Sequence, residues 1–429
     1  MWRLAYRIFH AVSGVQYWLE RHFTRAGWFV LGGAIAAGAL GVDTSLTLAY
    51  QIFTLLAALL VVAIVSSRFG AARYTVERSL PRMVTAGQAF SYRVRVTNAG
   101  GRPFAGVCLL DGGSDPRPSY AEFRARLKAP SYREWKRLLG TNQIVHMEES
   151  ELPPLAPRVE CELTVNAETY RRGIAHFAQV SLARADPLGI FRKLNVVHAP
   201  ANLLVLPRRY ELNPIHLPGS RHYQPGGMNL AASVGESEEF VSLREYRPGD
   251  SLQRIDWKSF ARTGQPVVRE YQDEFLERHA LVLDTFTGGA DETSFEEAVS
   301  IAASFASSIH TQECMLDLMF VGAESYCYSA GRGQLQTANL VEVLAGVRGC
   351  AEKPFRTLSE AVLSQRSLLA SAICILLAWD APRQELVRQL RVSGIPILVL
   401  VVTAGELPDK PDWLFVLAPG RIQEGLAAL

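Results

Sequence analysis

Two long apolar runs near the start are the most regular hydrophobic feature of the chain. They extend from Trp28 to Val42 and from Leu46 to Val65, and Asp43, the one acidic or basic residue of this region, separates them. A helix of about 20 apolar residues crosses the hydrocarbon layer of a bilayer, which is roughly 30 Å thick. The second run has this length and the first is shorter. The pattern predicts a two-helix transmembrane hairpin over residues 26–69.

Small residues and flanking arginines refine this hairpin. Four glycines in the first run allow two helices to approach closely, and a turn is expected at Asp43-Thr44-Ser45. Arginines lie on both outer sides of the hairpin: Arg3, Arg7, Arg21, Arg25, Arg68, Arg73, Arg78 and Arg82. The positive-inside rule therefore places both sides in the cytoplasm. A signal peptide fits poorly, because the apolar region begins late and a second run follows it.

Residues 1–25 have the pattern of a cytoplasmic amphipathic helix. Arginines alternate there with aromatic residues such as Trp2, Tyr6, Tyr17 and Trp18. Such a helix lies along a membrane interface, or it simply precedes the first membrane helix. The sequence leaves both alternatives open.

Short alternating segments replace the apolar runs between residues 70 and 207. The segment Tyr92–Thr97 alternates strictly and is followed by Asn98-Ala99-Gly100-Gly101, which has a turn composition. This pattern predicts a β-sandwich domain of the immunoglobulin-like kind. Further strands are expected at 160–165, 176–182 and 203–206, and a short helix at 132–139 inside an insertion.

Strands and helices alternate from residue 278 to the end. The apolar segment Ala280–Leu283 ends in Asp284, and a helical pattern follows over 295–310. This alternation predicts a doubly wound α/β domain over 278–429, with its functional loops at the carboxyl ends of the strands. Further elements are expected at 315–322, 337–346, 372–378, 383–392 and 396–402.

The segment Leu243–Glu270 concentrates arginines, carboxylates and turn residues within a connector over 208–277. A strand is expected to end near its beginning, and a capped helix and a second strand follow. The expected features are a strand end at Tyr246, a turn at Pro248-Gly249, an N-cap at Asp250, a helix over 251–263, a C-terminal exit at Gly264 and a strand over 267–271.

This segment resembles the signature of the bacterial DUF58 family. The matching residues are Glu245, Tyr246, Pro248, Gly249, Asp250, Arg254, Ile255, Asp256, Trp257, Lys258, Ala261, Arg262, Thr263, Gly264, Val268 and Glu270. Two earlier segments, Arg172-Gly173 and Asp186–Phe191, are similar to further segments of that family. So many matches at fixed spacing make the resemblance specific, and it covers most of the chain from Arg172 onward.

Asp284 begins a second resemblance, to a degenerate metal site of von Willebrand factor A domains. Asp284 and Thr287 match the first and last positions of that motif, whereas Phe286 replaces its middle oxygen ligand. Asp380 matches the aspartate of a later loop. Mg²⁺ prefers several oxygen ligands in octahedral geometry, so it is the candidate ion. The alternative is a recognition domain without a metal.

Composition limits the possible chemistry. The net charge is +2, and no basic tract is interleaved with aromatic residues, which argues against nucleic-acid binding. The six cysteines show no metal-ligand or disulfide spacing and indicate reduced thiols. The motifs of P-loop nucleotidases, zinc proteases, serine hydrolases and dinucleotide-binding enzymes are missing from the sequence.

The charges of the signature permit two interpretations. In the first, arginines brace the helix against its neighbours through ion pairs. The residues involved are Arg254, Arg262 and Arg269 with Asp256, Glu270 and Asp273. In the second, the exposed members form a docking patch for another protein.

The family resemblance implies a function. DUF58 proteins are similar in organisation to membrane-anchored partners of MoxR-type AAA+ ATPases, so we expect a non-enzymatic adaptor in the bacterial inner membrane, multi-pass, with cytoplasmic soluble domains. Other von Willebrand A proteins are further candidate partners. One alternative is a metal-assisted hydrolase that uses the signature carboxylates Glu245, Asp250, Asp256 and Glu270. The other is a metal-dependent protein-binding receptor.

Overall fold

The structure is a computed structural model of the chain. It describes residues 2–428 except 41–46, 68–72, 114–116, 121–122, 125–130, 214–239, 272–276, 289–290, 309–313, 331–333 and the positions 249, 251, 323, 352, 406, 408 and 409. The chain is multidomain and divides into two compact units. These are residues 1–209 with 341–347, and residues 210–340 with 348–429.

Three helices begin the first unit: α1 (Trp2–His22), α2 (Arg25–Leu40) and α3 (Thr47–Ser67). Among the described residues one helix, over Leu48–Ser67, is long and apolar enough to cross a membrane by length and composition. The apolar helix α2 is shorter, with 16 residues. The turn expected at Asp43-Thr44-Ser45 lies outside the described residues.

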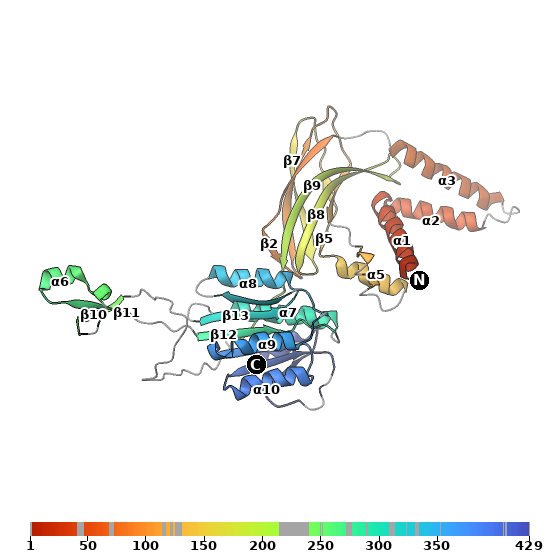
Figure 1. Ribbon diagram of the computed structural model, residues 1–429. Helices are drawn as coiled ribbons and strands as arrows, with labels where there is room; N and C mark the ends of the chain where they lie inside the picture. Colours follow the sequence, from red (N-terminus) through yellow and green to blue (C-terminus); the bar gives the residue numbers. More distant parts are fainter. Residues whose placement is uncertain are drawn as a thin grey trace. The chain divides into compact units, whose positions relative to one another are not determined.

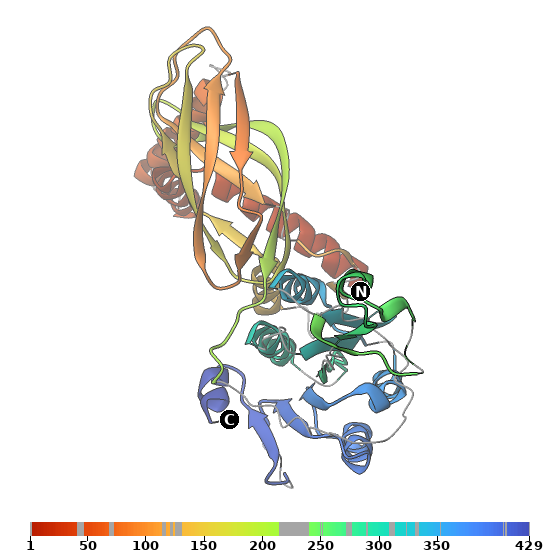
Figure 2. The same ribbon diagram turned by 90° about the vertical axis from the view of Figure 1, so that its left-hand side faces the viewer.

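Two curled sheets complete the first unit (Figure 2). The first contains, in spatial order, β1 (Tyr74–Ser79), β3 (Ala89–Asn98), β7 (Glu160–Thr169) and β5 (Val145–Met147). The second contains β2 (Met83–Thr85), β9 (Arg192–Leu206), β8 (Gly173–Ala185), β4 (Val107–Gly113) and β6 (Ser150–Leu152). Alternate side chains of both sheets share one core, with Val94 and Val165 from the first and Leu109 and Leu203 from the second. The alternation read from the sequence is the cause, since it gives each sheet one apolar face.

A buried ion pair joins the two sheets inside this core. Arg78 of β1 donates its Nε–H to Asp111 of β4 at 2.8 Å, and both side chains are almost completely buried. The hydroxyl of Tyr92 donates to the same carboxylate at 2.6 Å. The Arg78 guanidinium also lies 4.9 Å from the ring centre of Phe177. These contacts satisfy a charge that would otherwise be costly to bury.

The second unit contains a six-stranded sheet in the order β14-β13-β12-β15-β16-β17. The strands are β14 (Ser325–Ala330), β13 (Cys314–Val321), β12 (Glu277–Leu283), β15 (Ser371–Leu376), β16 (Ile397–Val402) and β17 (Leu414–Leu417). All neighbours are parallel except β13 and β14. The helices are α7 (Glu292–Ser308), α8 (Gln334–Gly346), α9 (Arg356–Ser364), α10 (Ala381–Val392) and α11 (Ile422–Ala427).

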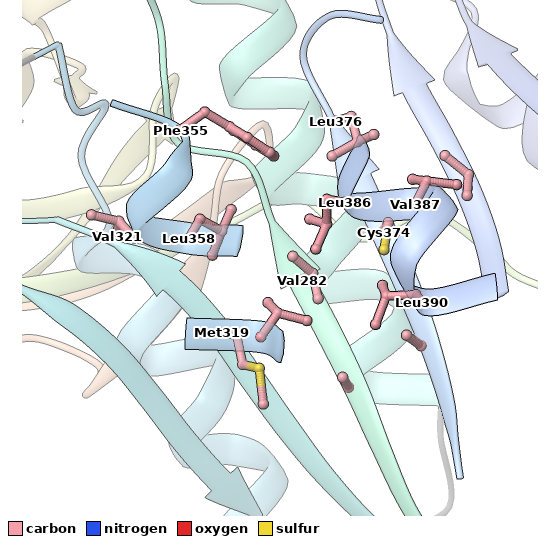
Figure 3. Close-up of a cluster of buried hydrophobic side chains, with 14 of the residues drawn as sticks. Val282, Met319, Val321, Phe355, Leu358, Cys374, Leu376, Leu386, Val387 and Leu390 are labelled. Carbon is pink, nitrogen blue, oxygen red and sulfur yellow. The ribbon is translucent and has the colours of Figure 1, made fainter. Parts of the chain in front are cut away.

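Helices cover both faces of this sheet. Four successive residues of β12, from Ala280 to Leu283, are completely buried, and successive side chains of a strand point to opposite faces. On one face Val282 and Met319 share a buried cluster with Leu358 of α9 and with Leu386 and Leu390 of α10 (Figure 3). A sheet buried on both faces places its chemistry at the strand ends, where the loops are.

The elements expected from hydrophobic periodicity are present, with shifted boundaries. The insertion helix is α5 (Tyr132–Asn142), capped by Ser131, whose hydroxyl accepts the N–H of Glu134. The sequence did not predict β14, α9, β17 or α11. β14 pairs antiparallel with β13 at one edge of the sheet.

Candidate functional site

The family signature forms a small element around a two-stranded ribbon. β10 (Phe240–Glu245) pairs antiparallel with β11 (Val267–Tyr271). Between them lie a short 3-10 helix, η1 (Leu252–Arg254), and the helix α6 (Trp257–Thr263). Figure 1 shows the strands and α6 in green. The expected order of strand, turn, helix, turn and strand is confirmed.

The single helix predicted over 251–263 is wrong in one respect, because it breaks in the middle. Ile255 forms a β-bridge with Val268, and the backbone N–H of Asp256 donates to Val267 at 2.9 Å. These strand contacts take both residues out of the helix. Asp256 is consequently the N-cap in place of Asp250, and it accepts the N–H groups of Lys258 and Ser259.

The end of this helix agrees with the prediction. Gly264 closes α6 in the left-handed conformation at φ 71°, and its N–H donates to the carbonyl of Phe260. Glycine adopts this conformation without the steric cost that a Cβ brings. The chain then turns directly into β11.

Two ion pairs hold the signature together. Arg244 binds both carboxylate oxygens of Asp250 at 2.7 Å, and the backbone N–H of Arg247 donates to the same group at 2.8 Å. Arg269 lies 3.4 Å from Asp256. The pair of Arg269 with Asp256 was predicted, whereas the pair of Arg244 with Asp250 was not.

The structure says less about the other signature residues. The side chains of Arg254 and Glu270, as well as Gly249 and Asp273, lie outside the described residues. Glu245 and Pro248 are exposed, and Tyr246 is half-buried with its N–H bonded to the carbonyl of Pro266.

An exposed group of aromatic and basic residues lies on α6, and we name it the aromatic–basic patch: Trp257, Lys258, Phe260 and Arg262. Trp257 is 62% exposed, and its ring meets that of Phe260 edge-on at 6.0 Å. Ile255 is buried, whereas both aromatic rings of the patch are open to solvent. The helix is too short to cover its own aromatic residues.

The Arg244–Asp250 pair gives the signature element a pH dependence. Hydrogen bonds from the side chain of Arg244 and the backbone of Arg247 lower the pKa of Asp250 from 3.8 to about 2. Because the pKa is lowered by folding, the stabilisation is complete above about pH 4 and is lost as the pH falls towards about 2.

We therefore expect the amide of Tyr246 to lose hydrogen-exchange protection between about pH 4 and pH 2. The substitution Asp250→Asn removes the titrating group and most of this dependence. Protection factors measured on both chains test the expectation, and an identical pH dependence in the two would contradict it.

Asp284 lies at the carboxyl end of β12 with its side chain completely buried. Its carboxylate accepts the backbone N–H of Phe286 and that of Leu377, each at 3.0 Å. It also accepts the Nε–H of Arg383 at 2.6 Å. Arg383 in turn donates from Nη1 to Asp380 at 2.6 Å. The guanidinium therefore lies between the two aspartates that were predicted to bind a metal.

A divalent cation does not fit this arrangement. Both oxygens of Asp284 are already hydrogen-bonded, and arginine stays charged, so it would repel a metal ion beside it. The backbone N–H of Thr287 bonds to Cys350, and its side chain packs against Gly349. Within the described part of the chain there is no group of three or more metal-ligating side chains.

Arg383 is the residue of this site that the sequence reading missed. It lies in the first turn of α10, whose N-cap is Asp380, and its guanidinium stacks 4.6 Å from the ring centre of Phe355. An Asp followed three residues later by Arg at a helix start was the available signal. The cation of this site is therefore supplied by the chain itself.

A second ordered site joins the N-terminal helices to the sheets of the first unit at Asp186–Phe191, which we name the Asp186 turn. The buried carboxylate of Asp186 accepts the backbone N–H groups of Leu188, Ile190 and Phe191 at 2.6 to 2.9 Å. The turn built in this way presents the carbonyl of Ile190, which accepts the backbone N–H of Thr24 at 3.1 Å.

The same turn fixes the corner between α1 and α2. The hydroxyl of Thr24 accepts the N–H of Gly27 at 3.0 Å and so caps α2. Phe23 packs edge-on against Phe191, with ring centres 5.4 Å apart, beside Ala63 of α3. The Asp186 turn therefore anchors all three N-terminal helices.

Comparisons with known proteins bear on the signature region. A family model described as "Protein of unknown function DUF58" matches residues 242–401. The uncharacterized protein YeaD of Bacillus subtilis (strain 168) is 27% identical over 197 residues, which are 44% of this chain and 47% of that protein. The chain thus matches about half the length of this curated relative.

Solved structures match the chain only weakly. The CARDB domain of the PF1109 protein from Pyrococcus furiosus, in complex with di-metal ions, is 18% identical with a TM-score of 0.19, covering 32% of this chain and 91% of that chain. The E. coli alpha-2-macroglobulin is 14% identical with a TM-score of 0.20, covering 36% and 9%. These scores are too low to carry an argument. The family model and the relative agree with the signature residues, and the region over residues 242–401 therefore belongs to the DUF58 family.

Proposed function

We propose that this protein is a non-enzymatic membrane adaptor that works with a MoxR-type AAA+ ATPase in the assembly, maturation or metal insertion of client proteins. The aromatic–basic patch carries the proposal. Exposed tryptophan and arginine side chains are typical of the residues that dominate the energy of protein interfaces. Here they lie on the segment that defines the family, so a partner common to the family would meet them.

The hydrogen bonds made by the carboxylates of the signature favour an adaptor over a hydrolase. Asp250 binds Arg244 and Asp256 caps α6, so both act as acceptors within the element. A general acid or base needs a pKa near the working pH, whereas the pKa of Asp250 is held at about 2. The metal-dependent receptor has no support from Asp284, because Arg383 occupies its carboxylate.

The fold supports a recognition role. The strand order of the six-stranded sheet, with one antiparallel edge strand, suits a doubly wound domain of the von Willebrand A-like kind. The two facing sheets of the first unit suit an immunoglobulin-like sandwich. Both are architectures that often serve binding, and this part of the proposal rests on that analogy.

The proposed location is the bacterial inner membrane, with α2 and α3 as a multi-pass anchor and the soluble domains in the cytoplasm. The apolar helix α3 and the arginines on both sides of the hairpin support it. All six cysteines are free, which suits a reducing compartment.

Crosslinking in the presence of ATP tests the adaptor function. The full chain, purified from bacterial membranes, should carry an AAA+ ATPase that mass spectrometry identifies. Trp257→Ala should reduce the recovered ATPase by tenfold or more, since loss of an interface hot spot costs about 2 kcal/mol or more. Tyr132→Ala is the matched control, because Tyr132 is 61% exposed on α5.

Three outcomes separate the parts of the proposal. Loss with Trp257→Ala alone supports the patch as the docking surface. Equal recovery from both variants moves the docking surface elsewhere on the chain. Repeated absence of any AAA+ ATPase from the wild-type preparation contradicts the adaptor function.

A further inference from the structure

The helix α1 has two apolar faces. One packs against protein, and the other is exposed except where the ring of Trp18 meets that of Phe191, with ring centres 6.0 Å apart. Phe9 on the inner face is 1% exposed and packs against Phe123 and Trp135, with ring centres 5.0 and 5.7 Å apart. Ser13, one turn later, is also buried. Trp135 belongs to α5, so this face of α1 packs on α5 within the first unit.

The opposite face carries what we name the outer stripe: Leu4, Ile8, Ala11, Val15 and Trp18. The spacing of four and three residues places these side chains on one side of the helix. Leu4 is 64% exposed, Val15 59%, and Ile8 and Trp18 each 47%. A soluble protein rarely exposes a continuous apolar stripe along a helix of 21 residues, so the stripe requires an occupant.

Charge and composition indicate which occupant. Arg3 and Arg7 lie beside the stripe, and Glu20 is the only acidic residue of α1. A helix with an apolar stripe, aromatic residues and flanking arginines matches the helices that lie in the interface of an anionic bilayer. Protein interfaces have a polar rim around an apolar core, whereas a helix in the membrane interface buries an apolar face along its length.

The placement of α1 agrees with this occupant. Thr24 caps α2 directly after α1, and Figure 1 shows α1 running across the direction of α2 and α3. In that view α5 lies on one side of α1 and the hairpin extends from the other. The inner face meets α5, so the outer stripe faces the side on which the hairpin leaves.

We propose that α1 lies flat in the membrane surface, with the outer stripe in the acyl chains and its arginines among anionic headgroups. This inference rests on the proposed membrane anchoring by α2 and α3. It adds a surface contact that would hold the sandwich close to the bilayer, because the inner face of the same helix is packed on α5.

Quenching by brominated phospholipids tests the proposal. The full chain is reconstituted into phosphatidylcholine and phosphatidylglycerol vesicles with or without bromine on the upper acyl carbons. Wild type is compared with Trp18→Phe in the outer stripe, Trp28→Phe in α2 and Trp257→Phe in the signature. The difference between wild type and each variant gives the emission of the replaced tryptophan. Bromine should quench most of the Trp18 emission, and it should not quench the Trp257 emission.

A second pair of variants tests the stripe itself. Val15→Glu places a charge in it and should lower the quenching of Trp18 several-fold, whereas Gln16→Glu on the flank should leave it unchanged. If Trp28 emission is quenched and Trp18 emission is not, this inference is wrong, but the membrane anchor formed by α2 and α3 is retained. If neither is quenched, the anchor and the inference both fall.

Discussion

Arg383→Ala is expected to lower the free energy of unfolding of the α/β sheet unit by about 3–5 kcal/mol, the usual cost of removing one partner from a buried ion pair. Asp284 stays completely buried in the variant and loses the Nε–H donor at 2.6 Å. Two backbone N–H groups remain, and they do not neutralise the charge. The loop that carries Asp380 also loses its bond to the guanidinium.

Arg388→Ala provides a matched control on the same helix. Arg388 pairs with Glu385 at 2.6 Å, but both side chains are about half exposed or more, so the change should cost no more than about 1 kcal/mol. Denaturant unfolding of the full chain in detergent, followed by a probe in the α/β unit, compares the two. Similar losses in both variants would show that burial of Asp284 is not the cause.

The same variant also tests the role of Arg383 as the cation of this site. In the wild type, Mg²⁺ or Mn²⁺ should leave the unfolding midpoint unchanged, because the carboxylates are occupied. In Arg383→Ala the two released aspartates should bind a divalent ion, which would restore part of the stability. A wild type that Mg²⁺ stabilises, with the effect lost in Asp380→Asn, would return the metal to this site.

This site shows where the sequence was informative and where it was not. The strand Ala280–Leu283 and the aspartate at its end followed from four apolar residues and a polar stop. The nature of the cation did not follow, since Asp284 and Arg383 are 99 positions apart and only the sheet brings them together. Periodicity reports local structure, whereas a buried partner is decided by topology.

In the signature, too, some features could be predicted from the sequence and others could not. Its strands and the glycine exit at Gly264 followed from local turn chemistry. The break at Ile255 did not, because it depends on a bridge to Val268 across the ribbon. The edge strand β14 escaped detection for another reason: its side chains, such as Tyr328, are partly exposed and lack the apolar run of the central strands.

Gly27→Ala should detach the N-terminal helices from the two sheets of the first unit. A Cβ at position 27 would lie 2.1 Å from the carbonyl oxygen of Ile190, which is backbone and cannot rotate away. The turn at Ile190 is itself held by Asp186, so the helix must move and the bond from Thr24 is lost. We expect a loss of stability of at least about 2–3 kcal/mol, at the upper end for overpacking.

Gly32→Ala is the control for Gly27→Ala, because the two substitutions should change the stability in opposite directions. A Cβ at Gly32 meets nothing within 4 Å, and alanine favours a helix over glycine by about 1 kcal/mol. The control should therefore be neutral or stabilising, while Gly27→Ala is destabilising. The unfolding midpoint and the hydrogen-exchange protection of the Thr24 amide measure both effects in the full chain.

Asp186→Ala should reproduce the effect of Gly27→Ala from the other side of the contact. It leaves the N–H groups of Ile190 and Phe191 without their acceptor in a buried turn, at about 1–3 kcal/mol each. The two substitutions act on one contact, so the double variant should lose less than the sum of the two single losses. Fully additive losses would mean that the helices and the Asp186 turn are held independently.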